Sequence, residues 1–240
     1  MMTVTSKHAL KITAILATAA LTVTGCGKYY TYKYKLTVSV RDHGELKSAS
    51  TVVAVTEPVG PTGNSGRPIV CGEAAVLSLA NGKTLFALLN GVSRDAVPGQ
   101  FHWRSVPTFV LLNRLGLETQ FGWKDDSGIE RLAETRTRVD KLHSYEMPDF
   151  VTFRDTADPT TIEQVDPQNS EMALGDGVRL ENVSLEASGE RVTKGAVEDA
   201  LPWFRGDNRY LDGSPQRESV RGYETDQFKR CSWIYLSDWL

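Results

Sequence analysis

The chain has 240 residues, with 27 Lys and Arg against 30 Asp and Glu, and a formal net charge of −3. This length is enough for one domain with a buried core. The mildly acidic balance disfavours a nucleic-acid-binding protein, because phosphate contacts need clustered Lys and Arg.

The first predicted element is a short apolar stretch, Ile12 to Val23. It has about half of the roughly 20 residues that a helix needs to cross a bilayer core, which disfavours a transmembrane helix. Lys7 and Lys11 precede the stretch without any acidic residue, and small residues follow it, as in a secretory signal. We therefore predict that residues 1–25 are a signal peptide and that its removal changes the formal charge from −3 to −5.

The end of this signal, Val23-Thr24-Gly25-Cys26, resembles the cleavage box of bacterial lipoproteins, an aliphatic residue and two small residues before a cysteine. The resemblance implies diacylglycerol on the Cys26 sulfur, cleavage before Cys26, and acylation of the new amino terminus, for example by palmitate. Several acyl chains anchor a protein far more firmly than one. The alternative is an ordinary cleaved signal that ends in a chance cysteine. The position after the cysteine is Gly27 and not the aspartate that, in lipoproteins of some bacteria, favours retention at the inner membrane. A periplasm-facing position at the outer membrane is therefore preferred.

Alternating residues predict a β-strand directly after Cys26. Tyrosines and aliphatic residues occupy the even positions and polar residues the odd ones, which is typical of a half-buried strand; the even positions carry Tyr30, Tyr32, Tyr34, Leu36, Val38 and Val40. A Tyr/Lys belt at the membrane interface is the alternative. We expect residues 26–29 to be a lipidated cysteine with a short tether, 30–240 to be one β-rich domain, and 205–240 to be an appended tail segment of that domain.

Two hairpins are predicted next. A turn over Asp42–Glu45, in which Gly44 can take a positive φ, leads to a returning strand over Thr51–Val55.

The second predicted hairpin pairs Ala74–Ala80 with Lys83–Leu89 around Asn81-Gly82, a dipeptide typical of two-residue type I′ loops. Such a loop would pair Leu79 with Thr84. Both faces of this hairpin are largely apolar, which predicts a central position in its sheet.

The later elements complete the predicted fold. A change of buried parity near Asn182 predicts a β-bulge. A capping box at Ser127 predicts a helix with an apolar stripe, and shorter helices are predicted within Asp166–Gly175 and Thr193–Leu201, while Pro107–Leu117 is compatible with strand or helix. The predicted fold class is α+β, mainly antiparallel β-sheet built from hairpins, with two or three short to medium helices.

Two segments, GEAAVLSLANGKTLFALL and VRLENVSLEASGERVTKGAVEDALPW, resemble segments of a group of uncharacterised proteobacterial exported proteins. The resemblance implies an exported domain. That group has no activity to carry over to this chain.

The sequence predicts no catalytic, metal-binding or cofactor-binding residues. The Gly-rich segment Gly60–Pro68 lacks the Gly-Lys-Ser/Thr of a phosphate loop, so it is interpreted as a connection. Ser65 and Ser127 precede glycines but lie outside a Gly-x-Ser-x-Gly motif. The histidines of the mature chain are widely separated and lack zinc-motif spacing; they are His43, His102 and His143.

Cys71 and Cys231 form a candidate disulfide, since an oxidising envelope would favour joining them. The alternative is two separately buried free thiols. A bond between them would tie the last segment, interpreted as a strand over Cys231–Leu236, to the body of the domain.

The sequence therefore predicts a lipid-anchored protein of the bacterial cell envelope that binds or scaffolds a protein partner and is not an enzyme. Its predicted contacts are membrane lipid through Cys26 and an envelope protein through sheet edges or the loops Arg94–Trp103 and Trp203–Tyr223, with no nucleic acid and no cofactor. The alternative is a membrane-tethered periplasmic hydrolase whose site assembles from residues such as His102 and His143.

Overall fold

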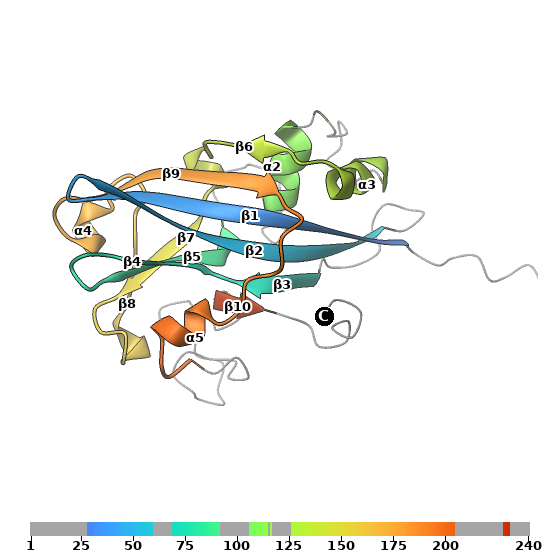
Figure 1. Ribbon diagram of the computed structural model, residues 1–240. Coiled ribbons are helices and arrows are strands. Elements are labelled where there is room, and N and C mark those ends of the chain that lie inside the picture. Colours follow the sequence, from blue (N-terminus) through green and yellow to red (C-terminus); the bar gives the residue numbers. More distant parts are fainter. Residues whose placement is uncertain are drawn as a thin grey trace, which may run out of the picture.

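The computed structural model describes residues 28–59, 69–91, 106–114, 116, 126–204 and 228–230, which form two antiparallel sheets packed face to face (Figure 1). The larger sheet has the order β10-β3-β2-β1-β9-β6 and the smaller one β4-β5-β7-β8. The prediction of a mainly antiparallel, β-rich α+β fold is confirmed. The strands are β1 (Lys28–Asp42), β2 (Glu45–Val59), β3 (Ile69–Glu73), β4 (Ala75–Ser78), β5 (Thr84–Gly91), β6 (Arg138–Val139), β7 (Pro148–Phe153), β8 (Ile162–Gln164), β9 (Val178–Ala187) and β10 (Lys229–Arg230).

Short helices surround the sheets. Within the described ranges they are α2 (Val106–Arg114), α3 (Asp126–Glu134), α4 (Glu171–Leu174) and α5 (Ala196–Ala200), with 3-10 turns η2 (Ser144–Glu146) and η3 (Pro159–Thr161). The ambiguous run Pro107–Leu117 is therefore helical in α2. The apolar stripe predicted from Ser127 is split, since Ile129 and Leu132 are buried in α3 whereas Val139 belongs to β6.

The strand predicted after Cys26 is confirmed as β1, and it already includes Lys28 and Tyr29 of the expected tether. The even-numbered side chains face the core, where Tyr32 and Tyr34 are only 3% and 4% exposed. They pack with residues of the smaller sheet, α2 and α3 in one apolar cluster. The alternation of β1 thus reflects burial against the second layer.

The first hairpin is confirmed at its turn. β1 and β2 pair from Asp42 opposite Glu45 to Lys28 opposite Val59, so β2 is longer than the predicted returning strand. The two turn residues are His43, with φ 50°, and Gly44, with φ 90°. Two successive positive φ angles are what a type I′ turn requires.

The predicted register of the second hairpin is wrong by one residue. Ser78, and not Leu79, pairs with Thr84, and Leu79 N donates to Lys83 O at 2.9 Å. The loop therefore has three residues, Ala80 to Gly82, of which only Gly82 has a positive φ, 83°. Three-residue loops of this kind close a type I turn with a left-handed residue.

The predicted central position of this hairpin is also wrong for β4, which is an edge strand of the smaller sheet. The second apolar face of the hairpin is explained by packing against other segments and not by a central position of both strands. The outer face of the smaller sheet is covered by a second apolar cluster, which includes Phe86, Phe153, Trp203, Phe204 and Phe228.

The predicted bulge near Asn182 is confirmed. Ser39 of β1 pairs with Asn182, whereas the next residue, Val40, pairs with Leu180, so Glu181 is the extra residue. Beyond the bulge, the Ser170 hydroxyl donates to Val178 O at 3.2 Å and accepts from Leu180 N at 2.9 Å. One buried side chain thus fills two backbone positions of β9 that β6, paired farther along, does not reach.

Gly72 of β3 lies close against Val53 of β2. A Cβ added at Gly72 would lie 2.8 Å from Val53 Cγ2, closer than real Cβ atoms approach, and 3.1 Å from Val53 Cα, which is a tight contact. Glycine at this position therefore permits the sheet to close over the buried Val53 side chain.

Candidate functional site

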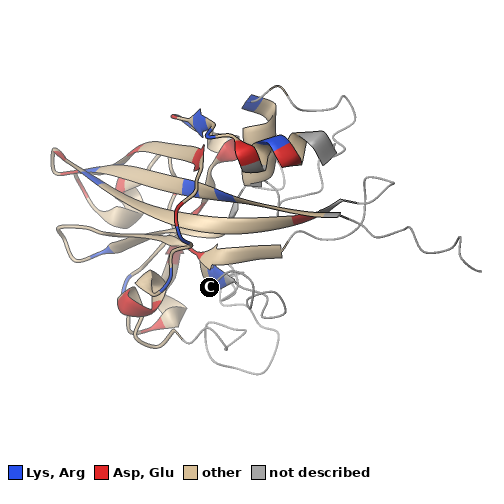
Figure 2. Ribbon diagram, turned by 45° about the vertical axis from the view of Figure 1, so that its right-hand side comes forward, with Lys and Arg blue, Asp and Glu red and all other residues tan. Residues whose placement is uncertain are grey.

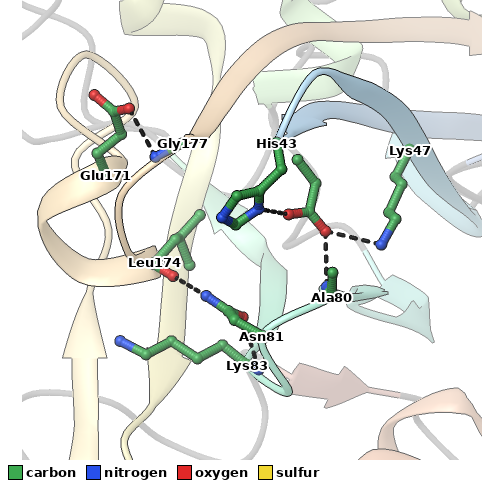
Figure 3. Close-up of polar contacts among 9 residues, drawn as sticks. His43, Lys47, Ala80, Asn81, Lys83, Glu171, Leu174 and Gly177 are labelled. Carbon is green, nitrogen blue, oxygen red and sulfur yellow. Dashed lines mark hydrogen bonds and ion pairs between the residues drawn. The ribbon is translucent and has the colours of Figure 1, made fainter.

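The best-defined polar cluster lies at the end of the sandwich opposite the start of β1, at the left in Figure 1. Three connections meet there: the β1–β2 turn, the β4–β5 turn and the α4–β9 connection (Figure 3). We call this set of connections the distal junction. It is a candidate site because buried polar groups need specific partners and therefore fix the geometry of their surroundings.

Asp42 is the central acceptor of the distal junction. Its carboxylate accepts from Lys47 Nζ at 2.8 Å, Ala80 N at 2.7 Å and His43 Nδ1 at 2.8 Å (Figure 3). The carboxylate itself is fully covered, while the Lys47 side chain is 25% exposed. The hydrogen bonds from Lys47, Ala80 and His43 hold the pKa of Asp42 far below its usual range.

Two further hydrogen bonds join the other connections. Asn81 Nδ2 donates to Leu174 O at 2.7 Å, and His43 N donates to Gly177 O at 2.9 Å. Lys83 Nζ also reaches a carbonyl of α4, that of Ala173. Each connection is therefore bonded to both of the others, which makes the distal junction a rigid end of the sandwich.

The chemistry available at the distal junction is limited. The His43 side chain is 60% exposed and its Nδ1 faces the Asp42 carboxylate, an arrangement that fixes the imidazole orientation. The neighbours drawn in Figure 3 supply no hydroxyl or thiol nucleophile beside it. Within the described ranges, no three His, Cys, Asp or Glu side chains come together in a way that could hold a metal ion.

A second buried carboxylate, Glu73, lies where the two sheets are joined. Its oxygens accept from Gly195 N at 3.0 Å and Ala196 N at 3.1 Å, so it caps the first turn of α5. Its side chain is 0% exposed. This contact holds α5 over the second apolar cluster.

A third buried polar group connects β1, β2 and α2. Thr108 Oγ1 donates to Glu57 Oε1 at 3.0 Å and also contacts the Tyr32 hydroxyl. Burial, and next the Glu57 carboxylate, raise the pKa of the Tyr32 phenol well above its ordinary value. Burial alone raises that of Tyr34.

The predicted site residues are scattered. Cys71 lies in β3 and is disulfide-bonded. Cys26 and Cys231 lie outside the described residues, so the lipidation of Cys26 and the pairing of Cys231 with Cys71 stay predictions. His143 precedes η2, where its backbone N donates to Glu146 Oε2 at 2.8 Å. His43 lies at the distal junction.

Other predicted features also fall outside the described part of the chain: Ser65, His102, the segment Gly60–Pro68 and the loop Arg94–Trp103. Of the loop Trp203–Tyr223, only its first two residues are described. Trp203 Nε1 donates to Thr156 O at 2.6 Å and so belongs to the second apolar cluster's rim.

Sequence reasoning missed the distal junction and the Glu73 cap. The partners are 38 residues apart for Asp42 and Ala80, and 122 for Glu73 and Gly195. No local pattern marks such pairs. The one usable signal is the even position of Asp42, which continues the alternation of buried side chains along β1 but was interpreted only as part of a turn.

Charged residues of both signs are interspersed over the described elements (Figure 2). Of the helices that the structure describes, none combines the length and the apolar character needed to cross a membrane. Comparison with family models, with curated proteins and with solved structures finds no match to this chain.

Proposed function

We propose that this protein is a lipid-anchored lipoprotein of the bacterial cell envelope that holds one end of a rigid β-sandwich at the membrane surface and binds a protein partner with the other end, the distal junction. The observation that carries the proposal is the position of β1. The strand begins at Lys28, only two residues after the cysteine of the lipobox-like sequence. An acyl anchor on Cys26 would therefore hold this end of the sandwich against the lipid headgroups.

The geometry of β1 gives the proposed anchor a direction. Its 15 residues rise about 3.3 Å each, so the strand carries the chain about 45 Å from its first residue to the distal junction. Tyr29, at the anchor end, is 62% exposed, and tyrosine is enriched at membrane interfaces. The anchor end would contact lipid while the distal junction extends into the envelope.

The distal junction supports the binding part of the proposal. Its three connections are bonded to one another, so a partner would meet a preformed surface and lose little conformational entropy there. Large apolar side chains are exposed near it: Met172 of α4 is 82% exposed and Leu46, next to the β1–β2 turn, is 56% exposed. Exposed apolar residues beside fixed polar groups are typical of protein-binding surfaces.

Lipidation is tested by metabolic labelling with a palmitate analogue followed by mass spectrometry of the mature amino terminus. We expect label on the wild type and none on Cys26→Ser. Cys231→Ser is the matched control, and it should keep the label. An unmodified terminus, together with release of the protein by osmotic shock, would contradict the proposal.

The partner is tested by placing a photo-crosslinking amino acid at Met172 or Leu46 and, as a positional control, at Tyr29. We expect one defined protein adduct from the distal positions in living cells and lipid adducts from Tyr29. A protein adduct from Tyr29 with none from the distal positions would show that the binding surface lies at the other end.

A further inference from the structure

Cys71 has a disulfide partner that the described residues do not include. It lies in β3, where it pairs with Ala54 of β2, and its side chain is partly exposed. The chain has three cysteines, so the partner is Cys26 or Cys231.

The register of β10 against β3 favours Cys231. Lys229 is paired with Glu73 and Arg230 with Gly72. Cys231 lies outside the described residues, but it directly follows Arg230, and a ladder continued by one residue in this register would set it opposite Cys71. Opposed Cα atoms in such a ladder are about 4.5–5.5 Å apart, which lies within the range that disulfides need.

The register of β1 excludes Cys26. Lys28 pairs with Val59, whereas Cys71 pairs with Ala54, five residues away on β2 and on its other side. At about 3.3 Å per residue and 4.8 Å per strand, Lys28 and Cys71 are about 19 Å apart. The two residues from Lys28 back to Cys26 span about 7 Å at most. The Cα atoms of Cys26 and Cys71 therefore stay about 12 Å or more apart, whereas a disulfide tolerates roughly 7 Å.

We infer that Cys71 is bonded to Cys231 and that this bond clamps the C-terminal segment onto the sandwich. The segment brings Phe228, which is 0% exposed, into the second apolar cluster, with its ring centroid 5.7 Å from that of Phe86. Ala74 N donates to Phe228 O at 2.6 Å, and Lys229 forms an ion pair with Glu198 of α5. The bond closes a span of 160 residues (231 − 71) and stands independently of the lipid anchor.

The bond forms by thiol–disulfide exchange. One cysteine thiolate attacks the disulfide of an envelope thiol oxidoreductase, and the second thiolate then displaces that enzyme from the mixed disulfide. Two thiols become one disulfide, and the oxidoreductase disulfide takes up the two electrons and, through solvent, the two protons, so that it leaves as its dithiol. The partial exposure of Cys71 gives the oxidant access.

Peptide mapping of the full-length protein from solubilised envelopes, alkylated without reduction, tests the assignment. We expect a Cys71–Cys231 linked peptide that disappears on reduction. A Cys26–Cys71 peptide would overturn both the inference and the lipid anchor. Alkylated Cys71 and Cys231 beside an acylated Cys26 would overturn the inference alone, and the linked peptide beside an unmodified Cys26 would overturn the lipid anchor alone.

A double-mutant cycle tests the clamp in the same full-length protein. Thermal unfolding is measured for Cys71→Ser, Cys231→Ser and the double variant. Either single variant should lower Tm by on the order of 10 °C, and the double variant should lower it no further. Additive losses would indicate two separate thiols and overturn the inference. Limited proteolysis should release the C-terminal segment from each variant, but not from the wild type.

Discussion

The Glu73 cap provides the sharpest test of the packing around the second apolar cluster. Replacing Glu73 by Gln keeps the shape of the side chain but turns one acceptor oxygen into an amide donor. Because the two oxygens accept from Gly195 N and Ala196 N at 3.0 and 3.1 Å, one of these backbone donors would then face another donor. The first turn of α5 would lose half of its cap.

The expected cost follows from that loss. Leaving a buried backbone donor without an acceptor costs about 1–3 kcal/mol, and the lost bond is charge-assisted, so we expect Glu73→Gln to lower the free energy of unfolding by about 2 kcal/mol. Urea denaturation of the chain without its signal, carrying Cys26→Ser, measures this directly. An unchanged m-value would show that the native fold is kept.

Glu163→Gln is the matched control. Glu163 contacts Arg154 Nε at 3.0 Å, but the two side chains are 30% and 59% exposed, so the same substitution should cost less than about 1 kcal/mol. Equal losses for Glu73→Gln and Glu163→Gln would refute the reasoning, because burial of the cap would then contribute nothing.

Three further predictions follow from the described contacts. Gly72→Ala should lower the urea midpoint by the equivalent of about 1–3 kcal/mol because β3 and β2 must separate, whereas Gly189→Ala, with no atom near its Cβ, should have little effect; equal midpoints would contradict this. The Asp42 carboxyl has a lowered pKa, so its stabilising effect is present above about pH 4 and is lost as pH falls further. Between pH 5 and pH 3, the urea midpoint of Asp42→Asn should therefore fall less than that of the wild type. Equal falls of the two midpoints would contradict this prediction. The raised pKa values of Tyr32 and Tyr34 predict that both phenols stay protonated in the fold as pH rises above about 10 and that stability falls there; absorbance titration should show them ionising only on unfolding.

Strand alternation predicted the first hairpin well because its information is local. The period of two in β1 and the positive-φ turn at Gly44 act on neighbouring residues, and the register follows from them. The second hairpin shows where local information ends. Asn81 does not form a two-residue loop, since its side chain is bonded to Leu174 O, 93 residues away.

The candidate site could not be predicted for the same reason. Asp42 has no sequence motif, and its burial depends on Ala80 and Lys47 arriving from other segments of the fold. The second apolar face of the β4–β5 hairpin likewise indicated a central position for both strands, but β4 is an edge strand, and α5 and Phe228 pack on that face. The lipidation of Cys26 stays a prediction from the linear sequence Val23-Thr24-Gly25-Cys26, since Cys26 lies outside the described residues.

The hydroxyl of Ser170 has a consequence for crowding. With the proposed lipid anchor, copies of this protein would diffuse in the plane of one membrane and collide side by side, and such collisions favour pairing between exposed sheet edges. The Ser170 hydroxyl occupies Val178 O and Leu180 N, so these two backbone groups of β9 are not available to pair with a strand of a second copy.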